Sequence, residues 1–242
     1  VQAWMPGAGA GRAVAKALSG ESNPGGKLPV TIPRSVGQVP IVYNQRIGSG
    51  YQGKGSKEAE MMDSLGQGAE TGLGGVAAIF DVKYVDGEIS PLFSFGYGLS
   101  YTKFVLADFE ILQKEIETSG EFAVRCSVKN TGEREGDEVV QLYTHFCNAH
   151  VVRPVKQLAG FARIHLHPGE KKRVTFQVKC AQLGYYDEEM RFVVEPGRLE
   201  VMVGNCADNL SFAGEVVLTG EVEEVLHKRS YTSQVTVEGN RG

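Results

Sequence analysis

Residues 121–132 read EFAVRCSVKNTG. Apolar side chains occupy every second position from Phe122 to Val128, and the positions between them are small or polar. This period of two is typical of a β-strand that buries one of its faces. The residues Asn130-Thr131-Gly132 follow and predict a turn, because asparagine and glycine tolerate the backbone conformations that turns require. The stretch therefore predicts a half-buried strand that ends in a turn.

The same period recurs further along the chain. Val140 and Leu142 alternate with more polar residues, as do the apolar positions of 174–178, and the sequence HPGE at 167–170 predicts a turn. The apolar runs 191–194 and 199–203 flank a Pro-Gly pair and predict a hairpin. Short alternating strands with hardly any helix predict a mainly β fold, an antiparallel β-sandwich. The side chains expected between its two sheets are Val124, Val128, Leu142, Phe161, Val174, Phe176, Val201 and Val203.

The rest of the chain differs in composition. Residues 1–43 are rich in glycine and proline, with a short helix predicted from Gly11 to Leu18 and an edge strand or extended connector from Leu28 to Ile32. These residues are too few for a domain of their own. The sequence then predicts four segments, which are 1–43, a loop and linker over 44–103, the sandwich domain over 104–220, and a tail over 221–242.

The composition is that of a soluble globular protein. The 242 residues carry a formal net charge of -4, which argues against nucleic-acid binding because phosphate contacts need a basic surface. No apolar run approaches the roughly 20 residues of a membrane span. The first residues show no signal peptide, and the cellular location is unknown from sequence. The four cysteines form no C-x-x-C pair, and the sequence predicts neither a cofactor nor a metal.

Several motifs, in order along the chain, resemble those of one enzyme family. They are NPGGKLPVTIPRSVGQVP at 23–40, PLFSFGYGLSYTKF at 91–104, VKNTG at 128–132, RPVKQLAGF at 153–161 and EPG at 195–197. The chain resembles the C-terminal portion of glycoside hydrolase family 3, and of its β-glucosidases in particular. The resemblance implies a fibronectin type III-like (immunoglobulin-like) sandwich preceded by the remnant of an α/β sandwich domain, 1–43.

The resemblance also implies a function. Retaining glycosidases use two carboxyl groups about 5 Å apart, one as nucleophile and one as general acid/base. In the family both come from regions that would precede Val1, and none of the 29 acidic residues here lies in a motif for either role. The chain is therefore expected to be the structural C-terminal portion of a retaining β-glucosidase that hydrolyses terminal β-glucosyl residues of oligosaccharides or glycosides. Alone it is expected to be inactive, and its partners are the enzyme's other domains. The alternative is a stand-alone carbohydrate-binding or protein-interaction module.

Two residues are candidates for substrate binding. Tyr84 and Asp86 could line a sugar site, because aromatic faces and carboxylates are what carbohydrate recognition uses. Arg153 is expected to pair with an acidic neighbour such as Glu138. The alternating glycines and large side chains of residues 95–99 predict a structural plug between domains.

Two other patterns are given structural interpretations. The glycine run 7–11 lacks the full G-x-G-x-x-G spacing, so it is interpreted as a turn and not as a dinucleotide site. His165 and His167 share strand parity and could lie on one face. They lack the helical spacing of a metal pair, so they are interpreted as polar surface residues.

Overall fold

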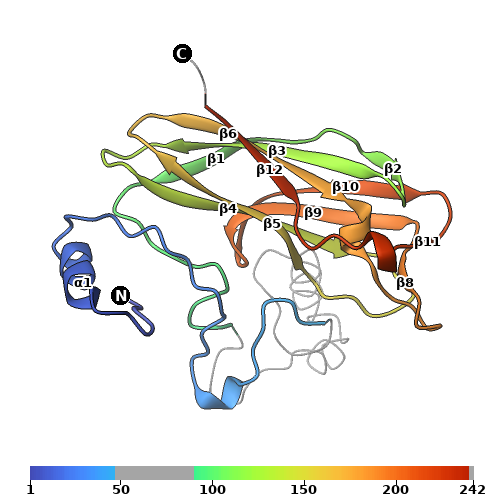
Figure 1. Cartoon of the computed structure of the whole chain (residues 1–242), viewed down its shortest axis with the longest axis horizontal. Helices are drawn as coiled ribbons and strands as arrows, with labels where there is room; N and C mark the ends of the chain where they lie inside the picture. The colour runs from blue at the N-terminus through green and yellow to red at the C-terminus, as the bar shows by residue number, and fades with distance from the viewer. Residues whose placement is uncertain (47–89, 240–242) are drawn as a thin grey trace, which may run out of the picture.

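The computed structural model describes residues 1–46 and 90–239. Two larger sheets pack face to face and form the predicted sandwich (Figure 1). Their strand orders are β1-β3-β6-β12 and β2-β10-β9-β4-β5, and a third, small sheet has the order β11-β8-β7. The strands are β1 Phe104–Ile111, β2 Glu115–Glu117, β3 Glu121–Asn130, β4 Gly136–Phe146, β5 Gln157–Leu166, β6 Lys171–Lys179, β7 Tyr185–Tyr186, β8 Phe192–Val194, β9 Gly197–Cys206, β10 Asn209–Thr219, β11 Glu223–Glu224 and β12 Gln234–Gly239.

The core lies between the two larger sheets. Side chains of β3 and β6 meet side chains of β4, β5 and β9 there, because successive residues of a strand point to opposite faces of its sheet. The predicted core residues that are fully buried are Val124, Val128, Leu142, Val174, Phe176, Val201 and Val203. The alternation in the sequence therefore located the interior of the sandwich correctly.

Phe161 is the exception, and its prediction as a core residue is wrong. Its side chain is 58% exposed. The buried apolar residues of β5 include Ala162, Ile164 and Leu166, so Phe161 has the opposite parity and faces away from the core. A spacing of three residues, as between Phe161 and Ile164, cannot place two side chains on one face of a regular strand.

The predicted hairpin around Pro196 is also wrong. β8 pairs with β7 and β11 in the small sheet, whereas β9 pairs with β4 and β10 in the five-stranded sheet. The Pro196-Gly197 pair thus leads from one sheet into another. Both runs are almost completely buried, and an apolar run carries no information about which strand lies beside it.

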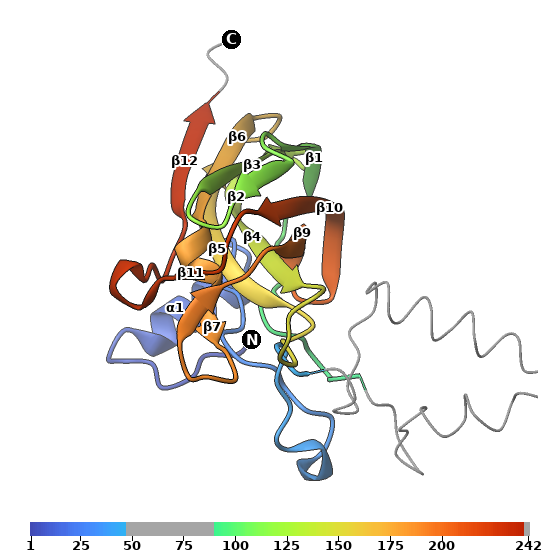
Figure 2. The same ribbon diagram turned by 90° about the vertical axis from the view of Figure 1, so that its right-hand side faces the viewer.

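Residues beyond 220 contribute a strand to the sandwich. β12 lies at the edge of the four-stranded sheet and pairs with β6, with Val235 opposite Phe176 and Val237 opposite Val174 (Figure 2). Three short 3-10 helices complete the described elements, η1 Val36–Gln38, η3 Cys180–Leu183 and η4 Leu226–Lys228. β12 thus lies within the predicted tail, 221–242, and belongs to the four-stranded sheet.

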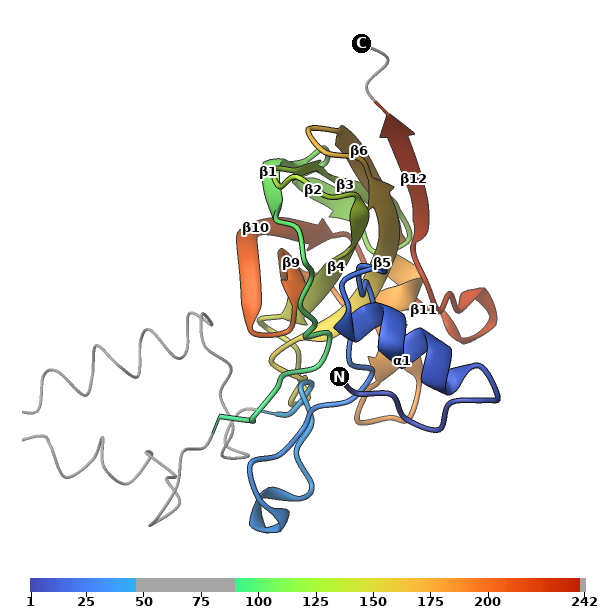
Figure 3. The ribbon, with the colours of Figure 1, turned by 90° about the vertical axis from the view of Figure 1, so that its left-hand side faces the viewer.

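The segments that precede the sandwich contain little regular structure. The helix α1 (Ala10–Leu18) confirms the predicted helix, buries no residue, and lies outside the two sheets (Figure 3). Residues 28–32 form a connector that bends at residues 29 and 30 and makes an isolated bridge between Ile32 and Phe93. Among the described residues, no helix has the length and apolar character needed to cross a membrane.

Candidate functional site at the junction of the N-terminal segments and the sandwich

The segments before and after residues 47–89 cover the outer face of the five-stranded sheet. Tyr143 of β4 and Met202 of β9 are buried on this face, away from the core. The rings of Tyr43 and Phe95 stack with centroids 4.3 Å apart, and Tyr43 meets Tyr143 edge-on at 5.8 Å. We name as the outer cluster the residues Tyr43, Phe95, Tyr143, Leu158, Met202, Ala207 and Leu210.

The polar atoms of the outer cluster are paired. The Tyr143 hydroxyl donates to Oε1 of Gln141, and Nε2 of Gln141 donates to the carbonyl of Asn205 at 2.8 Å. The Tyr43 hydroxyl accepts the backbone N–H of Leu158 at 3.3 Å. Burial raises the pKa of both Tyr43 and Tyr143, so both phenols stay neutral hydrogen-bonding groups. Such groups hold segments together and do not supply an ionised nucleophile.

Gly96 lets the backbone after residue 89 approach the sheet. Its φ is +80°, and an added Cβ would stand 2.4 Å from Oε1 of Gln141. Any other residue would be strained in conformation and would also collide with Gln141. The predicted plug is confirmed for Phe95, which packs in the outer cluster, and for the close approach at Gly96.

A nearly buried ion pair lies beside the outer cluster. Nζ of Lys27 is 2.7 Å from Oε1 of Glu138, with side chains 13% and 7% exposed. Nζ of Lys27 also donates to the carbonyl of Gly98 at 3.2 Å, and the N–H of Val139 donates to Glu138 at 2.8 Å. A buried charge is tolerated only when it is paired and hydrogen-bonded. The pair therefore fixes the position of residue 27 against β4.

Asn23 connects two further segments. Its Nδ2 donates to the carbonyl of Glu135 at 3.0 Å, and its Oδ1 accepts from the hydroxyl of Ser100 and the N–H of Tyr101 at 3.0 and 2.8 Å. Residues about 80 and 110 positions away in sequence thus meet at one amide. The side chain replaces backbone pairing where the chain has no regular structure.

The structure tests only some of the residues that the sequence singled out. Tyr84 and Asp86 lie outside the described residues. The predicted pairing of Arg153 with Glu138 is wrong, because Glu138 pairs with Lys27 and the Arg153 guanidinium lies 4.3 Å from the centre of the Tyr185 ring. Sequence reasoning did not identify Lys27, since a single lysine between a glycine pair and an apolar run carries no pattern.

Two of the buried carboxyl groups, Glu195 and Glu138, lack the raised pKa or the free carboxyl group that a glycosidase's general acid needs. Glu195 accepts hydrogen bonds from the Tyr185 hydroxyl and from Nδ1 of His150. Burial acts to raise the pKa of Glu195, but these hydrogen bonds outweigh it and the net pKa is lowered. A general acid at neutral pH needs a raised pKa. Glu195 has the opposite property, and Glu138 is occupied by Lys27.

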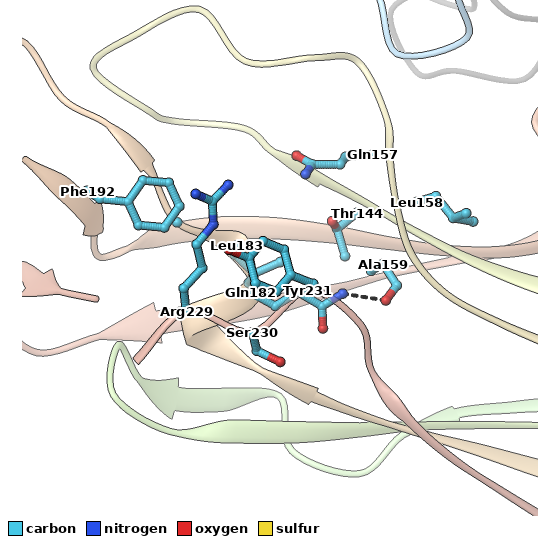
Figure 4. A pocket seen from close by; sticks show the side chains of 11 residues that line it. Thr144, Gln157, Leu158, Ala159, Gln182, Leu183, Phe192, Arg229, Ser230 and Tyr231 are labelled. Atoms are coloured by element: carbon cyan, nitrogen blue, oxygen red, sulfur yellow. Dashed lines mark hydrogen bonds between the residues drawn. The ribbon is translucent and has the colours of Figure 1, made fainter. Parts of the chain in front are cut away.

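A small cavity lies on the side of the sandwich near β5 and the segment before β12 (Figure 4). Its volume is about 100 Å³, well below the several hundred Å³ typical of ligand sites. Arg229 lies over the rings of Phe192 and Tyr231, at 4.5 and 5.0 Å from their centres, and Gln182 donates to the carbonyl of Ala159. These contacts connect the C-terminal segment to the sandwich, and the cavity is too small to enclose a sugar.

Comparison with known families separates the two parts of this junction. Residues 1–101 match the glycosyl hydrolase family 3 C-terminal domain, and residues 138–207 match the fibronectin type III-like domain. The chain belongs to glycoside hydrolase family 3. Lys27 lies in the first match and Glu138 in the second, so the buried ion pair joins two domains of this family.

Relatives of the family 3 chain are named as glycosidases. It is 35% identical over 204 residues to the periplasmic beta-glucosidase of Salmonella typhimurium and 37% identical over 204 residues to a beta-xylosidase of Formosa agariphila, covering 84% of this chain in each case. A crystal structure of the Listeria innocua beta-glucosidase in complex with glucose superposes with a TM-score of 0.77 at 32% identity, over 92% of this chain.

The family 3 chain spans only part of these proteins. It covers 24% of each of the two curated relatives and 28% of the Listeria innocua chain. The expected fold class and family are confirmed by these matches.

Proposed function

We propose that the chain is the structural C-terminal portion of a retaining β-glucosidase, in which the sandwich holds the end of an α/β sandwich domain in place. The observation that carries the proposal is the junction itself. Lys27, Tyr43 and Phe95 belong to the segments before residue 102 and are held on the sheet by Glu138 and Tyr143. An enzyme domain attached in this way keeps a fixed position relative to the sandwich.

Exposed apolar side chains on the same segments support the presence of a partner domain. Within the part of the chain that the structure describes, 23 large hydrophobic side chains are exposed, and 12 of them lie in residues 1–46 and 90–101. They include Trp4, Met5 and Leu99, at 55%, 98% and 73% exposure, and α1 buries no residue at all. Exposed apolar side chains at this density mark a surface that another part of a protein covers. In the proposed enzyme that part is the rest of the α/β domain.

The alternative, a stand-alone carbohydrate-binding or interaction module, is not favoured. Such a module would need no second family match over residues 1–101 and no apolar surface on irregular segments. The relatives include both a beta-glucosidase and a beta-xylosidase. We propose a terminal β-glucosyl substrate for the whole enzyme because the solved structure cited above is a beta-glucosidase with glucose bound.

Two experiments test this proposal. The purified chain is incubated with aryl β-glucosides and aryl β-xylosides, and no turnover is expected because no acidic residue of the chain lies in a motif for the nucleophile or the general acid/base of the retaining mechanism. In the second experiment, this chain replaces the matching C-terminal part of the Listeria innocua beta-glucosidase. Recovered β-glucosidase activity in this chimera is expected, and turnover by the isolated chain that disappears on changing one of its own carboxylates would contradict the proposal.

The chimera also tests Tyr84 and Asp86. We propose that these residues contact the sugar in the whole enzyme. Tyr84→Ala and Asp86→Asn are then expected to raise KM for an aryl β-glucoside, whereas Glu21→Ala, at the exposed Lys16–Glu21 pair, serves as the matched control and leaves KM unchanged. Unchanged KM in the first two variants would remove both residues from the proposed site.

A further inference from the structure

Two histidines and a glutamate lie together at one end of the β4–β5 pair. His165 and His167 are two residues apart, so both side chains lie on the same side of the strand end, and Leu166 between them is fully buried. Gly136 is the register partner of Leu166, which places Glu135 beside His167 and Asp137 opposite His165. The antiparallel register thus collects nitrogen and oxygen ligands on the face away from the core.

The distances suit one small cation. Nδ1 of His167 is 3.2 Å and Nε2 of His165 is 3.8 Å from Oε2 of Glu135. The potential ligand atoms of the three residues all lie within 4.8 Å of one another. Tetrahedral zinc ligands at bonds of about 2.0–2.1 Å stand roughly 3.3 Å apart. The three side chains are 49–66% exposed, so their ligand atoms are accessible to an ion from solvent.

A further carboxylate orients His165. Nδ1 of His165 is 3.2 Å from Oδ1 of Asp137, and Oδ2 of Asp137 is held by Nη2 of Arg163 at 2.7 Å. When Nδ1 carries the proton and donates to this carboxylate, the Nε2 lone pair is directed to the Glu135 side. Metal-binding histidines commonly have this carboxylate partner on their second nitrogen, because it fixes the ring and its tautomer.

We infer that Glu135, His165 and His167 bind a divalent transition-metal ion of the zinc class, with water in the remaining position. Two imidazoles and one carboxylate suit zinc, nickel or copper, whereas calcium and magnesium prefer a shell made of oxygen atoms. The site lies next to the junction, because the carbonyl of Glu135 accepts the hydrogen bond from Asn23. The inference does not depend on the enzyme function proposed above.

Calorimetric titration tests the site. The chain, purified without a histidine tag and treated with a chelator, is titrated with zinc chloride at pH 7.5, because metal binding competes with protons for the ligands. One equivalent is expected to bind saturably, and a melting scan is expected to show a higher Tm with zinc. The double variant His165→Ala/His167→Ala is expected to lose both effects, and Asp137→Asn to bind about 10–100-fold more weakly.

The control is His150→Ala, which removes an exposed histidine that also contacts a carboxylate, Glu195. It is expected to bind zinc as the unchanged chain does. The altered histidines are exposed and Asp137 is partly exposed, so the variants are expected to keep the far-UV circular dichroism spectrum of the original. The inference is overturned if the unchanged chain binds no zinc saturably, or if the double variant binds with the same affinity and stoichiometry.

Discussion

The core of the sandwich and the outer cluster are both buried, but they are built differently. The core consists of aliphatic and aromatic side chains from regular strands, and residues such as Val124 and Phe176 are completely inaccessible. The outer cluster joins the same sheet to segments with little regular structure and relies on tyrosines, on Gln141 and on the nearby Lys27–Glu138 pair.

The difference shows two ways of fixing a chain segment. In the core, area removed from water supplies the free energy, and many side chains of similar volume would serve. At the junction, polar groups must meet specific partners, because a buried polar atom without one is costly. We therefore expect losses in the core to act on global stability, and losses at the junction to act first on the attachment of residues 1–46 and 90–101.

The largest expected difference in the free energy of unfolding is between substitutions of two phenylalanines. Phe176→Ala leaves a cavity between the sheets and is expected to lower the free energy of unfolding by about 3–5 kcal/mol. Phe161→Ala, at an exposed position of β5, is expected to change it by at most about 0.5 kcal/mol. Urea denaturation followed by circular dichroism measures both. Equal midpoints would contradict the assigned faces of β5 and β6.

The next effect compares two ion pairs. Glu138→Ala leaves the Lys27 ammonium nearly buried without its partner, which is expected to cost about 3–5 kcal/mol in the attachment of the junction segments. Glu21→Ala breaks the more exposed Lys16–Glu21 pair and is expected to cost at most about 1 kcal/mol. Hydrogen exchange is the suitable measurement, because it reports on local opening.

In the Glu138→Ala variant, amides near residue 27 and in residues 95–101 are expected to exchange faster, while β3 and β6 stay protected. A double change, Lys27→Met with Glu138→Leu, is expected to restore most of the protection, because it removes both charges together. If Glu138→Ala left exchange at the junction unchanged, the pair would not hold these segments.

A smaller effect compares two glycines. Gly96→Ala places a methyl group against Gln141 in a backbone conformation with φ +80°, and about 1–3 kcal/mol of junction stability is expected to be lost. Gly26→Ala is the matched control, since an added Cβ there meets no atom within 4 Å. Exchange at the Ala207 amide, which donates to the carbonyl of Phe95, is the measurement. Equal exchange in both variants would contradict the close approach at Gly96.

The smallest effect depends on pH. The hydrogen bond that Nδ1 of His150 donates to Glu195 raises the pKa of His150 above 6.5, so the stability from this contact is complete below pH 6.5 and is lost as pH rises through the raised value. The lowered pKa of Glu195 makes its own contribution to stability complete above pH 4.5, and this contribution is lost as pH falls through the lowered value. Between pH 6 and 9, the Tm is expected to fall slightly more for the unchanged chain than for His150→Gln. Parallel profiles of Tm against pH for the two proteins would show that the His150–Glu195 contact does not contribute to stability.

The sequence predicted the core well and the junction poorly, for a physical reason. Alternation in β3 and β6 reports which side chains face the interior, and it assigned residues such as Val128 and Val174 correctly. It carries no information about strand partners, which explains the wrong hairpin at Pro196. The Lys27–Glu138 pair joins residues 111 positions apart through irregular backbone, and no local pattern marks such a contact.

The histidines show a related limit. His165 and His167 lack the helical spacing of metal ligands, but on a strand a spacing of two already places both imidazoles on one side. The third ligand, Glu135, comes from the neighbouring strand end, and only the register of β4 with β5 brings it close. In a hairpin, such a site can lie at the open end, where the first strand begins and the second strand ends.

The position of β12 has a consequence for self-association. This strand occupies the hydrogen-bonding edge of β6, which carries Val174, Phe176 and Val178 in one continuous alternation. A chain ended at residue 220 would leave that edge open, with a row of backbone donors and acceptors available to another molecule. β12 therefore blocks pairing of β6 with a strand of another molecule. β12 is itself short and largely solvent-exposed, so its own outer edge is a poor template for a further strand.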